Sequence, residues 1–269
     1  MTTPVLLCGS ISRLASPLGR SMHEAGYRAL GLAFVYVPFE VRDLPAAIGG
    51  MRALGIRGLG VSHPFKQQVM PLLDALDPVA QRIGAVNTVV NDGERLTGYN
   101  TDWLGAIRAL EEQRPLGGTR VLLVGAGGAA RAIAFGLRES GAHTTIANRD
   151  ESRAAALAAE TGARSAPFDE VRRAGEYDAV VNATTLGQSD GDRASPVGEE
   201  ALRAGQLVMD IVYKPLRTRL VEAARRRGAV VVHGGRMLLH QAGAQFQLYT
   251  GCAPPLEAMA DALRSAIGE

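Results

Sequence analysis

The alternation of short apolar runs with helical patterns restricts this chain more than any other feature of its sequence. Runs of four to seven apolar residues, such as residues 33–39 and 120–124, alternate with stretches whose apolar side chains recur with helical spacing. Strands and helices that take turns form parallel sheets through right-handed crossovers. The pattern therefore predicts an α/β fold built on parallel sheets.

The same alternation predicts where the individual elements lie. Strands are expected at residues 5–9, 33–39, 58–62, 120–124, 144–147, 178–182, 207–212 and 229–232. Helices are expected at residues 17–30, 44–54, 66–76, 102–112, 127–140, 151–161, 216–227, 236–249 and 256–267. Residues 86–91 and 95–98 flank the turn pair Asp92-Gly93 and are expected to form a hairpin.

The length of 269 residues allows one large domain or two modest ones. The alternation stops at the turn-rich segment 113–118 and restarts after it. We therefore expect a domain boundary between Asp102 and Gly118.

Composition excludes several classes of function. Apolar residues make up 46% of the chain and charged residues 21%, which is typical of a packed globular protein. The formal charge of +2 argues against a nucleic-acid partner. No apolar run is long enough to span a membrane, and no secretory signal is recognised. The two cysteines are too few for a disulfide framework, and the five histidines lack metal-ligand spacing. We expect a cytoplasmic protein without a metal.

The basic residues are strongly biased towards arginine. Of the 29 lysines and arginines, only Lys66 and Lys214 are lysines. A lysine amine can be tuned to lose its proton near neutral pH, whereas a guanidinium cannot. Two readings stay open at this point, a functional amine or a lysine retained by chance.

A glycine-rich turn is the sharpest local signal. The segment Gly125-Ala126-Gly127-Gly128-Ala129-Ala130 follows one expected strand and opens the next helix. In that setting Gly125 allows a tight turn, Gly127 lets the backbone approach a pyrophosphate, and Ala130 allows the helix to pack closely on the strand. Backbone N–H groups at the start of the helix then face the phosphates. The turn predicts a dinucleotide site.

The end of the next strand bears on the choice of cofactor. It reads Asn148-Arg149-Asp150, with Arg153 one turn into the following helix. Arginine suits the 2′-phosphate of NADP, whereas an acid suits the ribose hydroxyl of NAD. Asp150 is expected to cap the helix instead of facing the nucleotide. We therefore favour NADP over NAD, and the alternative is a solvated helix start.

Polar residues also lie at the ends of elements in the first half, namely Ser62, Lys66, Asn87, Thr101 and Asp102. A lysine and a carboxylate that converge near a nicotinamide suit proton transfer to an oxygen whose carbon gains or loses hydride. The spacing alone does not show that they converge.

The motifs in their order resemble the shikimate dehydrogenase family across essentially the whole chain. They are Val61-Ser62-His63-Pro64-Phe65-Lys66, Gly84-Ala85-Val86-Asn87-Thr88, Asn100-Thr101-Asp102, Gly125-Ala126-Gly127-Gly128-Ala129-Ala130-Arg131, Asn148-Arg149, Asn182-Ala183-Thr184 and Gln241. The resemblance implies an NADP-dependent reduction of the 3-keto group of 3-dehydroshikimate to shikimate. It also implies two domains with a cleft between them. Residues 1–102, completed by the C-terminal helices 237–269, would bind substrate, and residues 103–236 would form a doubly wound Rossmann-type domain for NADP.

The resemblance also implies roles for single residues. Lys66 and Asp102 match the catalytic pair, with the lysine as proton donor and acceptor. The positions that match substrate contacts are Ser16, Ser62, Asn87, Tyr213 and Gln241. Those that match cofactor contacts are Gly125, Ala126, Gly127, Gly128, Ala129, Asn148, Arg149, Arg153, Thr184 and Met237. For Met237 core packing is an equal alternative.

Several positions depart from the family pattern. Leu14 replaces the first serine of a serine-x-serine pair, with Arg13 beside it as a substitute donor or an exposed loop charge. Gly60 replaces a usual asparagine, His63 an apolar residue and Arg236 a common glycine. These departures favour the shikimate-dehydrogenase-like branch. Quinate or an amino-shikimate as substrate, and a nucleotide-binding regulatory protein without turnover, are the alternatives. We expect a monomer or a homodimer.

Overall fold

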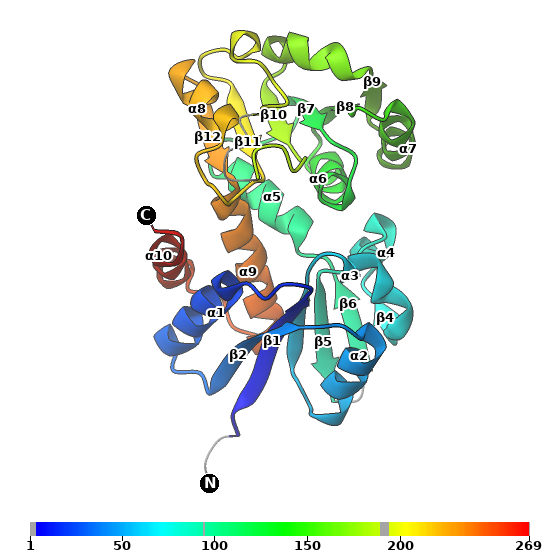
Figure 1. The fold of residues 1–269 in the computed structure, drawn as a ribbon, viewed down its shortest axis with the longest axis vertical. Helices are drawn as coiled ribbons and strands as arrows, with labels where there is room; N and C mark the ends of the chain where they lie inside the picture. Colours follow the sequence, from blue (N-terminus) through cyan, green and yellow to red (C-terminus); the bar gives the residue numbers. More distant parts are fainter. Residues whose placement is uncertain (1–3, 94, 189–193, 269) are drawn as a thin grey trace. The chain divides into compact units, whose positions relative to one another are not determined.

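The computed structural model describes residues 4–93, 95–188 and 194–268. The chain divides into two compact units (Figure 1). One contains the residues up to Thr101 together with those from Gln241 onward, and the other contains Asp102–His240. The boundaries that we expected after residues 102 and 236 lie one and four residues from these points. The chain passes between the units twice, the second time within helix α9 (Gly234–Thr250).

The first unit is built on a mixed sheet of six strands in the order β2-β1-β3-β5-β6-β4. Its strands are β1 (Leu6–Ser12), β2 (Phe34–Glu40), β3 (Gly58–Val61), β4 (Ala75–Leu76), β5 (Thr88–Asp92) and β6 (Arg95–Tyr99). Strand β1 pairs in parallel with β2 and β3, whereas β5 pairs antiparallel with β3 and β6. The expected hairpin reverses the chain at Asp92-Gly93, so this sheet is mixed instead of purely parallel.

Helices cover both faces of this sheet (Figure 1). The helices of this unit are α1 (Pro17–Ala29), α2 (Leu44–Ala53), α3 (Phe65–Gln68), α4 (Pro78–Ile83), α10 (Leu256–Ile267) and the second half of α9, with one 3-10 turn at Met70–Leu72. Helix α2 packs Leu44, Ile48 and Met51 into a core with Leu59 and Val89 of the sheet. The other face carries an aromatic cluster beneath α1 and α9.

The expected helix at residues 66–76 is wrong. Helix α3 ends at Gln68, and the chain then forms the 3-10 turn and strand β4. Pro71 lacks an N–H and its ring clashes with the preceding turn of an α-helix, so the helix does not continue. The next helix, α4, begins at Pro78 after the N-cap Asp77 and is followed by Gly84 in the left-handed conformation. These three residues are local helix signals, but the prediction from apolar spacing did not use them.

The second unit is a doubly wound parallel sheet in the order β12-β11-β10-β7-β8-β9, which confirms the expected fold class. Its strands are β7 (Arg120–Val124), β8 (His143–Ala147), β9 (Arg164–Ala166), β10 (Ala179–Asn182), β11 (Leu207–Asp210) and β12 (Val230–His233). Its helices are α5 (Asp102–Glu111), α6 (Gly128–Glu139), α7 (Glu151–Thr161), α8 (Arg219–Arg226) and the first half of α9, with 3-10 segments at Phe168–Glu176 and Glu199–Ala201. The chain starts at β7, runs outward to β9 and returns to β10. The strand order therefore reverses between β7 and β10, where open sheets of this kind bind ligands.

A buried histidine lies in the aromatic cluster of the first unit. His23 of α1 is fully buried and stacks on Tyr36, with ring centroids 4.5 Å apart and planes 10° from parallel. Tyr27 and Tyr249 lie within 6 Å of the same ring. Burial lowers the pKa of His23 to about 3, and the side chain of Gln245 offsets only part of that effect. The folded unit thus holds this imidazole neutral.

This burial predicts a specific loss of stability in acid. An unfolded histidine binds a proton near pH 6.5, whereas folded His23 resists protonation until about pH 3. Stability falls as pH drops through this window, because the unfolded state binds the extra proton. His23→Phe removes the contribution. As the pH is lowered from 6.5 to about 3, we expect the unfolding free energy of the wild type to fall more steeply than that of the variant. The difference in slope should be up to about 1.4 kcal/mol per pH unit. Urea unfolding at a series of pH values measures both slopes, and equal slopes would contradict the assignment.

Candidate functional site

The glycine-rich turn follows β7 at the point where strand order reverses. Gly125 has φ +119°, and a Cβ built on it would lie 2.9 Å from the carbonyl oxygen of Ala183. Its N–H donates to the carbonyl of Ala147 at 2.9 Å, which joins the turn to the end of β8. A side chain at this position is excluded both by conformation and by space. Gly125 therefore lets three loops meet at one edge of the sheet.

The next two glycines face open space. No atom lies within 4 Å of a Cβ built on Gly127 or Gly128. Gly127 is the N-cap of α6, and no side chain caps the helix there. The first N–H groups of a helix need partners outside the helix, and phosphate oxygens are suitable ones. The turn and the start of α6 thus have the room and the donors to hold a pyrophosphate, with Ala126 and Ala129 half-buried beside them.

Two arginines at the end of β8 have no carboxylate partner. Among the described residues, no carboxylate lies within 4 Å of the guanidinium of Arg149 or of Arg153, and both side chains are exposed. Asp150 accepts hydrogen bonds from the backbone of Ser152 and Arg153 at 3.1 and 3.3 Å, so it caps α7 as expected. The hydroxyl of Ser152 and these N–H groups lower the pKa of Asp150. The acid is thus turned to the helix, and the two guanidinium groups stay available to an anion.

A buried carboxylate ties the ends of β10 and β11 together. Asn182 donates to Asp210 at 3.0 Å and accepts from the backbone and hydroxyl of Thr184 at 3.0 and 2.7 Å. Asp210 also accepts from the hydroxyl of Thr218 at 2.6 Å. Burial raises the pKa of Asp210, and these hydrogen bonds counter only part of that rise. The sequence prediction missed Asp210 and Thr218, although the acid ends an apolar run.

Two further residues predicted to bind ligands, Tyr213 and Met237, also lie in the second unit. Tyr213 comes three residues after Asp210, and 39% of its surface is exposed. Met237 on α9 is 8% exposed and belongs to the core of the second unit. Core packing, one of the two readings left open for Met237, thus describes its surroundings.

In the first unit, Ser62 and Lys66 follow β3. The N–H of Ser62 donates to the carbonyl of Ile11 at 3.0 Å, and the serine is exposed. Lys66 is the second residue of α3 and is half-buried, and its carbonyl accepts from the N–H of Val86 at 2.8 Å. Both residues therefore lie at the carboxyl edge of this sheet.

A buried amide network holds the chain just before Asp102. The Oδ1 of Asn87 accepts from the N–H of Thr101 at 2.7 Å and from the hydroxyl of Thr88 at 2.8 Å, and its Nδ2 donates to the hydroxyl of Thr101 at 3.0 Å. Asn87 is fully buried and Asp102 is 3% exposed. Asn87 thus fixes Thr101, the residue before Asp102, on both its backbone and its side chain.

The remaining predicted residues of the first unit lie on helices. Ser16 is the N-cap of α1, and its hydroxyl accepts from the N–H of Leu18 at 3.5 Å. Gln241 is half-buried on α9. Gln245, one turn further, is buried and donates to the carbonyl of Asn87 at 3.2 Å and to Thr88 at 3.0 Å. The prediction missed Gln245, although its spacing from Gln241 puts both on one face of the helix.

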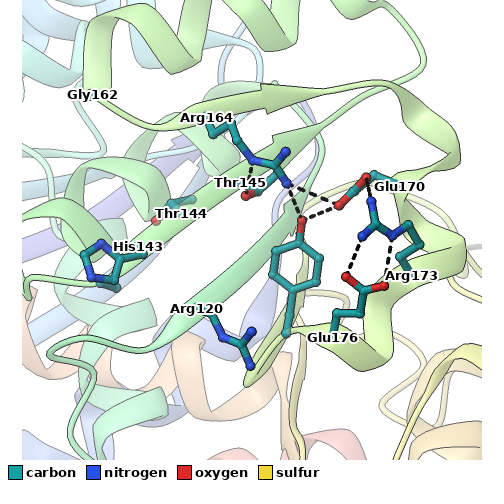
Figure 2. Close-up of a pocket in the computed structure, with 11 residues that line it drawn as sticks. Arg120, His143, Thr144, Thr145, Gly162, Arg164, Glu170, Arg173 and Glu176 are labelled. Carbon is teal, nitrogen blue, oxygen red and sulfur yellow. Dashed lines mark hydrogen bonds and ion pairs between the residues drawn. The ribbon is translucent and has the colours of Figure 1, made fainter.

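A polar hollow of about 470 Å³ lies at the opposite, amino-terminal edge of the second sheet (Figure 2). Its three guanidinium groups are all paired: Arg120 with Asp178, Arg164 with Glu170, and Arg173 with Glu176. The hydroxyl of Tyr177 also donates to Glu170, at 2.6 Å. Arg120 thus joins the start of β7 to the residue before β10, and Arg164 joins the start of β9 to the 3-10 segment Phe168–Glu176, so we interpret the hollow as a structural network.

Over the parts of the chain that the structure describes, no three His, Cys, Asp or Glu side chains form a cluster suited to a metal ion. No helix in the same parts has the length and apolar character needed to cross a bilayer.

Known families match the chain in three successive segments. The profile "Shikimate dehydrogenase substrate binding domain" matches residues 7–89, "Shikimate / quinate 5-dehydrogenase" matches residues 108–191, and "Shikimate 5'-dehydrogenase C-terminal domain" matches residues 234–264. A shikimate dehydrogenase (NADP(+)) of Moorella thermoacetica is 43% identical, with 97% of this chain and 94% of that protein covered. The chain belongs to the shikimate dehydrogenase family.

Solved structures of the family have the same fold. Shikimate 5-dehydrogenase of Thermus thermophilus, in complex with NADP(H) and shikimate, has a TM-score of 0.90 and 37% identity, covering 98% of this chain and 100% of that one. Quinate dehydrogenase of Corynebacterium glutamicum, in complex with NAD, has a TM-score of 0.90 and 35% identity, covering 97% and 99%. The fold is thus shared by family members that differ in cofactor and substrate.

Two departures from the shikimate dehydrogenase pattern have structural explanations. A Cβ on Gly60 would lie 3.3 Å from the Nε2 of Gln245 and 3.4 Å from the hydroxyl of Tyr36, so a larger side chain would displace Gln245 from Asn87. Arg236 pairs with Glu112, which also binds His240 at 2.7 Å.

The ion pairs of Glu112 join the end of α5 to the start of α9. Burial alone would raise the pKa of Glu112, but the hydrogen bonds from Arg236 and His240 outweigh it and lower that pKa. The arginine therefore serves the packing of two helices of the second unit.

Two alanine substitutions in the turn should separate folding from binding. Gly125→Ala forces a positive φ on a side chain and a contact with Ala183, so we expect a loss of about 1–3 kcal/mol of unfolding free energy. Gly127→Ala meets no neighbour and should unfold like the wild type, while its methyl group obstructs a bound dinucleotide. Thermal unfolding and titration with a dinucleotide measure the two effects. A Gly127→Ala variant that binds normally would show that the turn does not approach a pyrophosphate.

Proposed function

We propose that this chain is an NADP-dependent shikimate dehydrogenase, which reversibly reduces the 3-keto group of 3-dehydroshikimate to the hydroxyl of shikimate. The observation that carries the proposal is the nucleotide edge of the second unit. There an open glycine turn adjoins the end of β8, where Arg149 and Arg153 have no carboxylate partner among the described residues. Family membership supplies the substrate class.

The cofactor fits the residues at that edge. Gly125, Ala126, Gly127, Gly128 and Ala129 would hold the pyrophosphate through backbone N–H groups. Arg149 and Arg153 would bind the 2′-phosphate through charge-assisted hydrogen bonds, with Asn148 beside the ribose. Thr184 and Met237 would lie towards the nicotinamide. When bound, NADPH supplies the hydride.

Lys66 carries the proton in this proposal. Addition of hydride to the C3 carbonyl carbon leaves a negative charge on the oxygen, which the ammonium of Lys66 stabilises and then protonates from Nζ. In the reverse direction the neutral amine accepts the proton of the C3 hydroxyl. Asp102 orients the ammonium and accepts a hydrogen bond from the neighbouring ring hydroxyl.

The ring itself is held by polar side chains. We assign Ser16, Ser62, Gln241 and Tyr213 to its carboxylate and hydroxyls. We assign Asn87 to the same ring contacts. Its hydrogen bonds to Thr101 support a second, positioning role, because they hold the backbone just before Asp102.

Absorbance of the reduced nicotinamide tests the proposal directly. Purified protein mixed with NADP+ and shikimate should produce NADPH. Faster turnover with quinate, with an amino-shikimate or with NAD would assign the chain to one of the alternative activities. Binding of NADP without turnover of any of these acids would indicate a regulatory protein.

We infer a cytoplasmic location, which is supported by two free thiols, Cys8 and Cys252, because free thiols persist in a reducing compartment. The expectation of a monomer or a homodimer stays a prediction, and sedimentation equilibrium of the purified chain decides it.

Replacing Lys66 should separate chemistry from binding. We expect Lys66→Ala to lower kcat by about 10²–10⁴-fold, since a positioned acid–base group contributes that much. The KM for shikimate and the Kd for NADP should change little, because the amine acts chiefly in the transition state. Lys66→Arg keeps the charge but yields no proton near neutral pH, so its kcat should fall as well.

Gln67→Ala is the matched control, since Gln67 is the exposed neighbour on α3. Steady-state kinetics and NADP titration of the three variants give all the values. Wild-type turnover by Lys66→Ala would remove the assigned role.

Replacing Arg149 tests whether this residue binds the 2′-phosphate that distinguishes NADP from NAD. We expect Arg149→Ala to raise the Kd for NADP by about 10- to 100-fold, the range of a lost charge-assisted hydrogen bond. The Kd for NAD, which lacks the phosphate, should change less than about twofold on the same reasoning.

Arg138→Ala is the control for loss of one exposed arginine, because Arg138 lies at the far end of α6, about 15 Å along the helix from the glycine turn. Calorimetric titration with both dinucleotides measures the ratio. Equal weakening of NADP and NAD by Arg149→Ala would show that this arginine does not distinguish them.

A further inference from the structure

The loop that follows β1 lies beside the segment that carries Lys66. Strands β1 and β3 are parallel neighbours with Ile11 opposite Val61. The N–H of Ser62 continues this pairing to the carbonyl of Ile11 at 3.0 Å. Residues 13–16, which follow β1, and residues 62–66, which follow β3, therefore share the carboxyl edge of the first sheet.

One cation in this loop is held in place without being neutralised. The guanidinium of Arg13 lies 5.6 Å from the centroid of the Phe65 ring. Phe65 is 2% exposed and directly precedes Lys66, so a rigid ring supports the arginine through a cation–π contact. Within residues 4–93, 95–188 and 194–268, no carboxylate lies within 4 Å of that guanidinium.

Three other arginines of the same unit differ in this respect. Arg20 pairs with Glu24 at 2.9 Å, and Arg52 pairs with Asp74 at 2.8 Å. Arg57 pairs with Asp92. Their charges are compensated within the protein, whereas the charge of Arg13 is not.

The other residues of the loop offer little to an anion. The side chain of Leu14 is 81% exposed and has no donor. The hydroxyl of Ser16 accepts a hydrogen bond at the start of α1, and its own proton gives an anion one neutral donor without a charge. Lys66 is assigned to proton transfer, and a permanent ion pair with a ring carboxylate would compete with that duty. An acid bound at this edge therefore needs a second cation, and a guanidinium can grip a carboxylate with two parallel hydrogen bonds.

We propose that Arg13 binds the carboxylate of the substrate and selects cyclic acids over uncharged cyclic polyols. The inference rests on the proposed function, and it names the residue that recognises the acid group. Phe65, which supports the guanidinium, directly precedes the lysine that protonates the reacting oxygen, so Arg13 would hold the carboxylate of the substrate while its C3 carbon reacts.

The test compares two enzymes with two substrates. Arg13→Ala and the wild type are assayed with shikimate and with the analogue in which a carboxamide replaces the carboxylate. We expect Arg13→Ala to raise the KM for shikimate by about 10- to 100-fold and to change kcat by less than about threefold, as for a group that binds equally in ground and transition states. The KM for the carboxamide should be the same in both enzymes.

Two further variants sharpen the result. Arg13→Lys keeps the charge but loses the two-pronged geometry, so its KM for shikimate should lie between those of the wild type and Arg13→Ala. Arg42→Ala removes an exposed arginine from the loop after β2 and should leave both substrates unaffected.

The outcomes distinguish this inference from the proposed function. Turnover of shikimate by the wild type, with an unchanged KM in Arg13→Ala, overturns the role of Arg13 and leaves the activity standing. Equal effects on the acid and the carboxamide overturn it too. Calorimetric titration of shikimate onto both enzymes gives the same comparison without turnover, so a wild type that fails to oxidise shikimate sinks the proposed function alone.

Discussion

The close approach of Gly125 to the carbonyl of Ala183 is the constraint on which the nucleotide edge of the second sheet depends. Strands β7 and β10 are neighbours in the sheet but are separated in sequence by two complete strand–helix excursions. Their loops therefore meet only because one lacks a side chain. Once they meet, Asn182 can bind Asp210 on one side and Thr184 on the other, and the start of α6 stays open. A Cβ at position 125 would meet the carbonyl oxygen of Ala183 at 2.9 Å and the methyl group of Thr184 at 3.2 Å, so the chain after β10 would have to shift.

In the first unit, hydrogen bonds between buried side chains position the polar residues. Its polar edge is organised by a buried amide network instead of a glycine contact, with Asn87 bound to Thr101 and Gln245 bound to both Asn87 and Thr88. Buried amides in a low-dielectric interior are costly when unpaired and rigid when paired. The network therefore limits the freedom of the strand end that leads to Asp102. Gly60 belongs to this arrangement, because its missing side chain leaves the space that Gln245 occupies.

The sequence predicted those elements whose ends are encoded locally. Helix α7 begins behind the cap of Asp150 and ends at Gly162 in the left-handed conformation, and both bounds were predicted correctly. The expected helix at 66–76 failed because the apolar spacing continues across Pro71, which breaks the helix. The bonds of Gln245 to residues 87 and 88 span more than 150 positions, and those of Asp210 to Asn182 span 28, so no local pattern encodes them. Fold class followed from periodicity, whereas the positioning network needed the three-dimensional structure.

Pairing with a carboxylate leaves many arginines of this chain unavailable to anions, and position in the fold decides which of the others can reach a ligand. A neighbouring carboxylate cancels most of the positive electrostatic potential of a guanidinium. An anionic ligand must therefore displace that carboxylate before it can bind. Arg120, Arg164 and Arg173 are in that position at the amino-terminal edge of the second sheet (Figure 2). Arg13 and Arg149 instead follow the carboxyl ends of β1 and β8, and Arg153 lies in the first turn of α7. An arginine-rich protein can recognise two different anions, a phosphate and a carboxylate, only if it keeps such groups clear of its own acids.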